Sequence, residues 1–167
     1  MIKKEKDFLP HIFFSKLKNI VSGNIFQWYF QYGTNLPTKE SVDNFMFTHT
    51  LYFKESNSEW FPTFEPILYF MDEKYKVEQL LRMKLNLYVN QHKKLKHDPH
   101  LDFPDMLDQN VKIGLLNFTT CNGGTNINKE TYDSKENELI VFDNKLEHYG
   151  ITQTNTPTRI VLNIGWK

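Results

Sequence analysis

The stretch LRMKLNLYVN, residues 81–90, alternates apolar and polar side chains along its whole length. Successive side chains of a β-strand point to opposite faces, so this period of two predicts a strand with one apolar face and one polar face. The polar face is rich in groups that bind ligands. It consists of Arg82, Lys84, Asn86, Tyr88 and Asn90.

Patterns on either side of this stretch predict the rest of the fold. Apolar residues at helical spacing indicate helices, and short runs rich in β-branched and aromatic residues indicate strands. The Asn-Gly pair within Cys121–Gly124 predicts a tight hairpin between two of these strands. We therefore expect an α+β, mainly β fold, with a sandwich or barrel in its second half. The helices are expected within 8–33 and over 64–71, and the strands at 44–53, 111–119, 139–142 and 159–166.

Composition indicates one folded domain. The chain has 167 residues, 40% of them hydrophobic, and its 20 basic residues balance its 20 acidic ones. Zero net charge argues against binding to nucleic acid or to an anionic membrane through bulk charge. No apolar run of the kind found in a secretory signal or a membrane helix is present, so we expect an intracellular, cytoplasmic protein. The single cysteine, Cys121, excludes an intrachain disulfide and a zinc site built of several cysteines.

Two histidines and one aspartate have the spacing of a metal site. His100 and Asp102 are two residues apart, so in an extended segment their side chains project to the same side. His148 follows the predicted strand at 139–142 after a turn. Two imidazoles and one carboxylate on one side of an ion leave three positions open, which suits non-haem Fe(II) with a bidentate ligand and dioxygen. A structural zinc site would instead be closed by four protein ligands.

Arg159 adds a positive charge at the start of the last predicted strand, past His148. Its guanidinium could bind the far carboxylate of a dicarboxylic acid through two hydrogen bonds. A structural ion pair is the alternative role for this residue.

Ordinary interpretations of the other polar residues stay open. A His-x-Asp pair also arises by chance, and the Asp-Pro pair before His100 is typical of a surface turn. His97 could compete as a ligand, although its offset of three residues points it elsewhere on an extended strand. Asn86 and Tyr88 could lie on a solvated sheet face. The histidines expected to have no special role are His49 and His92.

Several motifs together resemble the 2-oxoglutarate- and Fe(II)-dependent oxygenases. They are PHLDF at residues 99–103, GGT at 123–125, the strand at 139–142, His148 and Arg159. Within that superfamily the chain is most similar to the prolyl 4-hydroxylase-like branch, especially to short phage-encoded members. The resemblance implies a single oxygenase domain over 1–167. Its core would be a double-stranded β-helix, or jelly roll, at about 79–167, supported by N-terminal helices and strands at about 1–78.

The same resemblance implies the ligands of the site. His100, Asp102 and His148 would bind Fe(II), and Arg159 would bind the distal carboxylate of 2-oxoglutarate. Asn86-Leu87-Tyr88 resembles the Asn-x-Tyr that contacts 2-oxoglutarate in the nucleic-acid demethylase branch, which makes Tyr88 and Asn86 further cosubstrate-binding candidates. No catalytic residue beyond the metal ligands is implied.

The implied reaction is a hydroxylation by O2, coupled to decarboxylation of 2-oxoglutarate to succinate, with ascorbate as an accompanying reductant. A peptidyl proline or a small amino acid is the favoured substrate. The alternatives are a nucleic-acid demethylase of the same superfamily and, from a different class, a non-catalytic jelly-roll binding module. Salt-dependent binding of oligonucleotides would favour the first, and a lack of iron with no loss of thermal stability on chelation would favour the second.

Two positions depart from the pattern of these families. Prolyl hydroxylase-like proteins often carry a Tyr where this chain has Leu115, so one carboxylate contact is missing and Tyr88 is the candidate replacement. The nucleic-acid demethylases carry a second Arg where this chain has Gly165, which weakens the demethylase interpretation.

Substrate specificity is expected in loops around the mouth of the barrel, at 22–39, 54–62 and 125–137. Loop composition alone encodes neither a particular small molecule or peptide nor an oligomeric state.

Overall fold

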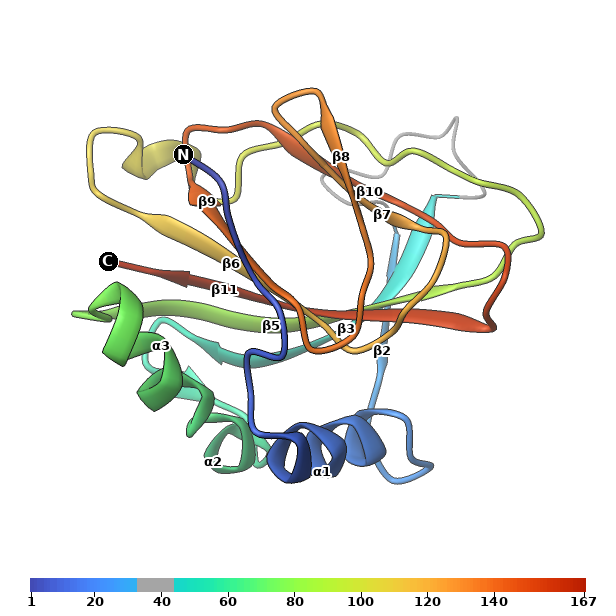
Figure 1. Ribbon diagram of the computed structural model, residues 1–167, viewed down its shortest axis with the longest axis horizontal. Coiled ribbons are helices and arrows are strands. Elements are labelled where there is room, and N and C mark those ends of the chain that lie inside the picture. The colour runs from blue at the N-terminus through green and yellow to red at the C-terminus, as the bar shows by residue number, and fades with distance from the viewer. Residues whose placement is uncertain (33–43) are drawn as a thin grey trace.

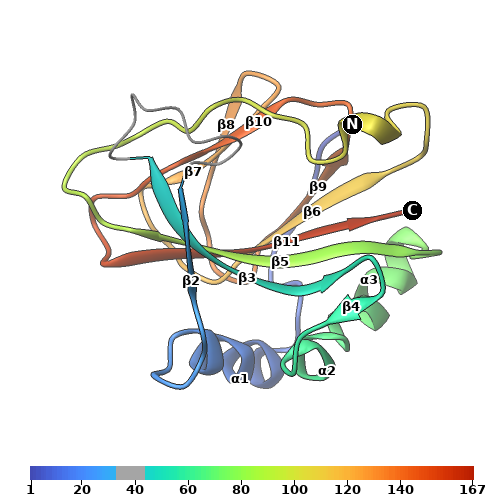
Figure 2. The ribbon, with the colours of Figure 1, turned by 180° about the vertical axis from the view of Figure 1, so that it is seen from behind.

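The computed structural model describes residues 1–32 and 44–167, and it consists of two antiparallel β-sheets with helices on one side. Two predicted segments extend beyond the described residues. These are the helical segment within 8–33, at Gly33, and the loop at 22–39, from residue 33 onward. In Figures 1 and 2 the small sheet lies on one side of the large sheet and the three α-helices lie on the other. The predicted mainly β jelly-roll architecture is confirmed.

The large sheet has the strand order β1-β9-β6-β11-β5-β3-β2, with β4 paired to β3. The small sheet has the order β10-β7-β8. The strands of the first half are β1 (Lys3–Glu5), β2 (Tyr29–Tyr32), β3 (Phe45–Phe53), β4 (Ser56–Asn57) and β5 (Leu80–Val89). Those of the second half are β6 (Lys112–Asn117), β7 (Gly124–Ile127), β8 (Glu130–Asp133), β9 (Leu139–Asp143), β10 (His148–Ile151) and β11 (Thr158–Trp166).

The helices cover the outer face of the large sheet (Figure 2). They are α1 (His11–Val21), α2 (Phe61–Phe64) and α3 (Ile67–Tyr75), and a short 3-10 helix spans Pro104–Met106. The buried stripe of α1 is Phe14, Leu17 and Val21, which packs in one core cluster with sheet residues such as Leu162. Within the described residues, no helix has the length and apolar character that a membrane crossing requires.

The helix predicted over 64–71 is wrong in its extent, because the structure has two helices there. α2 ends at Phe64 and α3 begins at Ile67. Pro66 lies between them, and proline lacks the N–H that a continuous helix would need at this point.

Strand β5 has the two faces predicted from its alternation. Its apolar residues Met83 and Leu85 are fully buried in the core cluster that contains the helices. The polar residues on the opposite face line a cavity between the sheets. They are Arg82, Lys84, Asn86 and Tyr88.

The tight hairpin predicted at Cys121–Gly124 is wrong, and so is the mouth loop predicted at 125–137. The chain leaves β6 in the large sheet, passes through this segment and enters β7 in the small sheet, so no two-strand hairpin is closed here. Residues 124–133 form the hairpin of β7 and β8 instead. The glycines allow close backbone approach: a Cβ on Gly123 would lie 2.8 Å from the carbonyl oxygen of Ile151, and one on Gly124 would overlap that of Tyr132.

Replacing Gly124 by alanine should destabilise the fold by about 1–3 kcal/mol, the usual cost of forcing atoms into filled space. The added Cβ would meet a carbonyl oxygen of the paired strand β8, and backbone held in a sheet does not move away cheaply. Gly114→Ala is the matched control, because its nearest contact is the Trp166 side chain at 3.1 Å. Urea denaturation measures both losses, and equal losses in the two variants would contradict this account.

Candidate functional site

His100, Asp102 and His148 come together between the two sheets. Their ligand atoms all lie within 4.8 Å of one another, with His148 Nε2 3.4 Å from Asp102 Oδ2 and His100 Nε2 4.0 Å from Asp102 Oδ1. The backbones of the two histidines form an isolated antiparallel bridge, with N–O distances of 3.0 and 3.1 Å. Residues that face each other in such a bridge project their side chains to the same side. The bridge therefore places both imidazoles beside the carboxylate.

Both imidazoles are oriented by their own chain. His100 Nδ1 lies 3.1 Å from the carbonyl oxygen of Asp98, and His148 Nδ1 lies 3.4 Å from that of Leu146. A carbonyl oxygen only accepts, so Nδ1 carries a proton in each ring, and in the neutral form of such a ring Nε2 has the lone pair. The two lone pairs and a carboxylate oxygen face one point, which is the donor set of a facial metal site.

Asp102 is held by two further side chains. Arg82 forms an ion pair with Oδ1, and Asn163 Nδ2 donates a hydrogen bond of 2.9 Å to Oδ2. Arg82 also donates to Asn163 Oδ1 at 3.1 Å, which ties the two supports together. Burial alone would raise the pKa of the Asp102 carboxyl, but the Arg82 charge, the neighbouring His148 and the Asn163 hydrogen bond hold that pKa well below its usual value. Asp102 is therefore a carboxylate at neutral pH.

His100 is ready to bind a metal at neutral pH. Burial, together with the neighbouring His148, lowers the pKa of His100 below its ordinary value, despite the opposing effect of Asp102. A neutral imidazole is the form that coordinates a metal.

Arg159 lies in the interior with much of its guanidinium unpaired. Its side chain is 1% exposed, and Nη2 donates a hydrogen bond of 2.8 Å to Thr125 Oγ1. The guanidinium carbon lies 5.1 Å from the centre of the Tyr88 ring, which faces it across the β5–β11 pair. Nε and Nη1 are buried and have no partner among the described residues. Buried donors without acceptors are rare in proteins, so these atoms indicate a place for an anionic ligand.

A cavity of about 100 Å³ connects the metal candidates to the polar face of β5. Asn86 faces it with an Oδ1 atom that has no partner among the described residues. Lys84 also lines it, and burial with the nearby Arg82 charge lowers the pKa of its amine to about 8. Within the described part of the chain, the lining consists of Met46, Arg82, Lys84, Asn86, Tyr88, His100, Leu101, Asp102 and Asn163.

His97 is not in the metal cluster, as its offset from His100 predicted. It is buried beside the Tyr88 ring, with ring centres 5.1 Å apart, and its Nδ1 contacts Asn44 Oδ1. Burial and the charge of Arg159 lower the pKa of His97 to about 4, so it is neutral. His49 is likewise in a structural contact, with Nδ1 2.7 Å from the carbonyl oxygen of Gln27, and His92 is exposed.

The residues proposed from the sequence thus converge on one interior surface: the three ligand candidates at one end, Arg159 and Tyr88 at the other, and Asn86 along the wall between them.

The sequence did not reveal the residues that hold these side chains in place. Arg82 and Lys84 were visible as part of the polar face of residues 81–90, and Asn163 belongs to a face of 159–166 that also alternates. No spacing rule connects Thr125 to Arg159, because they meet across the two sheets.

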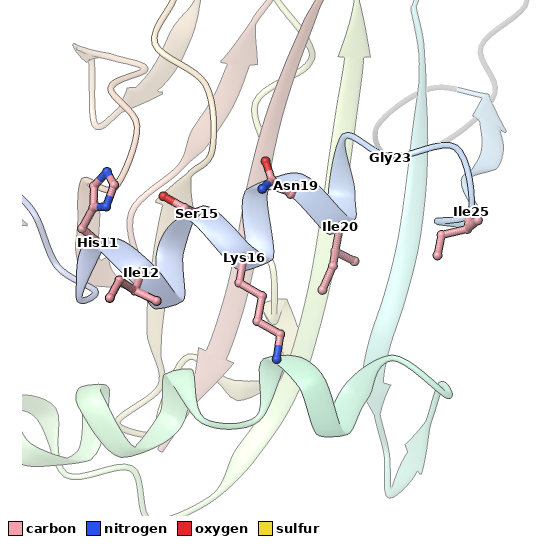
Figure 3. A pocket seen from close by; sticks show the side chains of 8 residues that line it. All are labelled: His11, Ile12, Ser15, Lys16, Asn19, Ile20, Gly23 and Ile25. Atoms are coloured by element: carbon pink, nitrogen blue, oxygen red, sulfur yellow. The ribbon is translucent and has the colours of Figure 1, made fainter.

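A second hollow, of about 760 Å³, lies far from this chemistry on the outer side of α1 (Figure 3). Its lining includes Ile12, which is 86% exposed, and Ile25, which is 74% exposed. None of the metal candidates borders it.

Comparison with known proteins places the fold among oxygenases. No family model matches the chain, and no curated protein matches it either. Among solved structures, it is similar to a 2OG-Fe(II) oxygenase family oxidoreductase from Burkholderia pseudomallei, with a TM-score of 0.68 and 9% identity over 99% of this chain and 84% of that one. It is also similar to a prolyl-4-hydroxylase from Pseudomonas putida, with a TM-score of 0.62 and 14% identity over 99% and 91%.

A third similar structure is a prolyl hydroxylase from Trichoplax adhaerens in complex with a hypoxia-inducible factor oxygen degradation domain peptide fragment. It has a TM-score of 0.64 and 11% identity, over 99% of this chain and 82% of that one. At these identities the likeness concerns the fold. This chain has the fold of the 2-oxoglutarate- and Fe(II)-dependent oxygenases.

Proposed function

We propose that this protein is an Fe(II)- and 2-oxoglutarate-dependent dioxygenase that hydroxylates its substrate. The observation that carries the proposal is the convergence of two Nε2 lone pairs and one carboxylate inside an oxygenase-type jelly roll. Three protein donors on one side of an ion match the facial arrangement of non-haem iron and leave positions for the cosubstrate and dioxygen. A closed structural zinc site would require a fourth protein ligand, and no further His, Cys, Asp or Glu joins the cluster among residues 1–32 and 44–167.

The residues present fit an iron ion at the position between His100, Asp102 and His148. Their spacings of 3.4 and 4.0 Å are near the roughly 3 Å between neighbouring ligands of a six-coordinate ion with bonds of about 2.1 Å. When bound, iron and 2-oxoglutarate supply oxygen activation, in which the cosubstrate is decarboxylated to succinate and a C–H bond of the substrate is hydroxylated.

The protein's part is to hold and orient these groups. Nε and Nη1 of the buried Arg159 have no partner among the described residues, so we assign the distal carboxylate of 2-oxoglutarate to this guanidinium. Tyr88 lies against that guanidinium. Asn86 is two residues before Tyr88 on the same face of β5, nearer to the metal ligands. In this proposal these two side chains complete the cosubstrate site. Tyr88 replaces the tyrosine that prolyl hydroxylase-like proteins often carry at the position of Leu115.

A peptidyl proline or a small amino acid remains the favoured substrate. Prolyl hydroxylases occur repeatedly among the similar structures, and one of them is bound to a peptide fragment. The likeness to short phage-encoded members of the branch stays a prediction. Ascorbate would act as a reductant that keeps the metal in the Fe(II) state.

The purified protein should release succinate from 2-oxoglutarate when Fe(II) and ascorbate are supplied, and His100→Ala should lower this release to background. The imidazole Nε2 of His100 supplies one of the three protein donors found among the described residues, so its loss leaves the ion weakly held. Succinate is measured by mass spectrometry. His92→Asn is the matched control, because His92 is exposed and its φ of 58° suits asparagine. This variant should release as much succinate as the wild type. Equal release by His100→Ala and the wild type would refute the metal assignment.

Arg159→Met should raise the KM for 2-oxoglutarate at least tenfold while leaving metal binding intact. The substitution removes the carboxylate partner but lies at the far end of the site from the metal ligands. Binding of Mn(II) is followed by loss of the free-ion electron paramagnetic resonance signal, and KM by succinate release. An unchanged KM would show that Arg159 serves only the structural contact with Thr125.

A further inference from the structure

Lys84 is a partly buried cation without a counter-ion. It lines the same cavity as His100 and Asp102, yet it forms no hydrogen bond or ion pair within the described part of the chain. Partial burial makes water a poorer partner for an ammonium group, which is why charged groups inside proteins are normally paired with an opposite charge.

The other two cations of this interior surface have partners, but only one of those partners is an anion. Arg82 is paired with the Asp102 carboxylate. Arg159 contacts Thr125 and the face of Tyr88, both of which are neutral. Among the described residues, this surface therefore carries three cations and a single carboxylate, and a metal ion would add two more positive charges.

The position of Lys84 is fixed by the strands on both sides of it. On β5 it lies between Arg82 and Asn86, and it faces Asn163 on β11 and Thr50 on β3. Asn163 in turn donates to the Asp102 carboxylate. Lys84 is thus placed beside the metal ligands, away from the Arg159 end of the same face.

We propose that Lys84 binds a carboxylate that sits next to the metal ion. This inference rests on the proposed function and deepens it, because it gives the pocket a second carboxylate-binding cation besides Arg159. A carboxylate is small enough for the cavity, which has a volume of about 100 Å³. An ammonium group is a compact charge that can donate to a carboxylate without the fixed geometry of a guanidinium. The carboxylate is either the keto-acid end of 2-oxoglutarate or an acid group of the substrate.

Calorimetric titration of the full chain loaded with Mn(II) separates the two ends of the pocket. The titrants are 2-oxoglutarate and 2-oxobutyrate, which keeps the keto-acid end but lacks the distal carboxylate. The variants are Lys84→Met, which removes the charge at similar length, and Lys84→Arg, which keeps the charge. Arg159→Met is the matched comparison.

If the bound group is the keto-acid end, Lys84→Met weakens the binding of both acids about tenfold, whereas Lys84→Arg stays within about threefold of the wild type. Arg159→Met then weakens the binding of 2-oxoglutarate alone. If the group belongs to the substrate, both acids bind Lys84→Met normally. Acetate added to the complex with Mn(II) and 2-oxoglutarate then shows paramagnetic broadening of its methyl signal in the wild type and Lys84→Arg, but not in Lys84→Met.

The proposal is overturned if neither keto-acid affinity nor acetate broadening depends on Lys84. That result differs from failure of the proposed function, in which the wild type itself binds no Mn(II) or no 2-oxoglutarate. Thermal unfolding without ligands is the structural control: Lys84→Met should melt no lower than the wild type, because it removes an unpaired charge. Should it melt lower, Lys84→Gln takes its place in the same titrations.

Discussion

The register between β5 and β11 is the constraint on which the interior surface depends. It sets Tyr88 opposite Arg159, Lys84 opposite Asn163, and Arg82 opposite Gly165. A slip of one residue would turn all of these polar groups toward the helices and the apolar residues toward the cavity. The fully buried apolar side chains of the two strands, which pack under the helices, penalise that slip. The helical layer thus fixes the chemistry on the opposite face of the sheet.

Local patterns were sufficient to predict much of the site. The alternation of residues 81–90 depends only on the strand's own period, and His100 and Asp102 are joined by a spacing of two residues. The supports of Asp102 depend on pairing between distant strands, which no local pattern encodes. Gly165 is an example: the sequence shows only a missing arginine, whereas the structure pairs Gly165 with Arg82 on β5, whose guanidinium binds Asp102.

The errors at residues 121–137, a hairpin that does not form and a loop that is two strands, share a cause. An Asn-Gly pair is typical of a hairpin, but here Gly123 serves a close backbone contact with Ile151, which is far away in the sequence, and Gly124 serves one with Tyr132 on the neighbouring strand β8. The residues after them alternate too weakly to indicate strands, yet β7 and β8 form because β7 pairs with β10 as well. Strand β10 also brings His148 to His100, so the mispredicted segment pairs with the strand that closes the candidate metal site.

The interior of this jelly roll contains polar groups without partners, which lower the stability of the fold when no ligand is bound. Among the described residues, Arg159 Nε and Nη1 and Asn86 Oδ1 are buried without a hydrogen-bond partner, and Lys84 forms no ion pair. Each such group opposes folding unless a ligand satisfies it. Ligands that bind only the folded state stabilise it in proportion to their concentration and affinity. Metal and dicarboxylate binding should therefore be coupled to the stability of the β5–β11 pair itself, because the unsatisfied groups sit on those two strands.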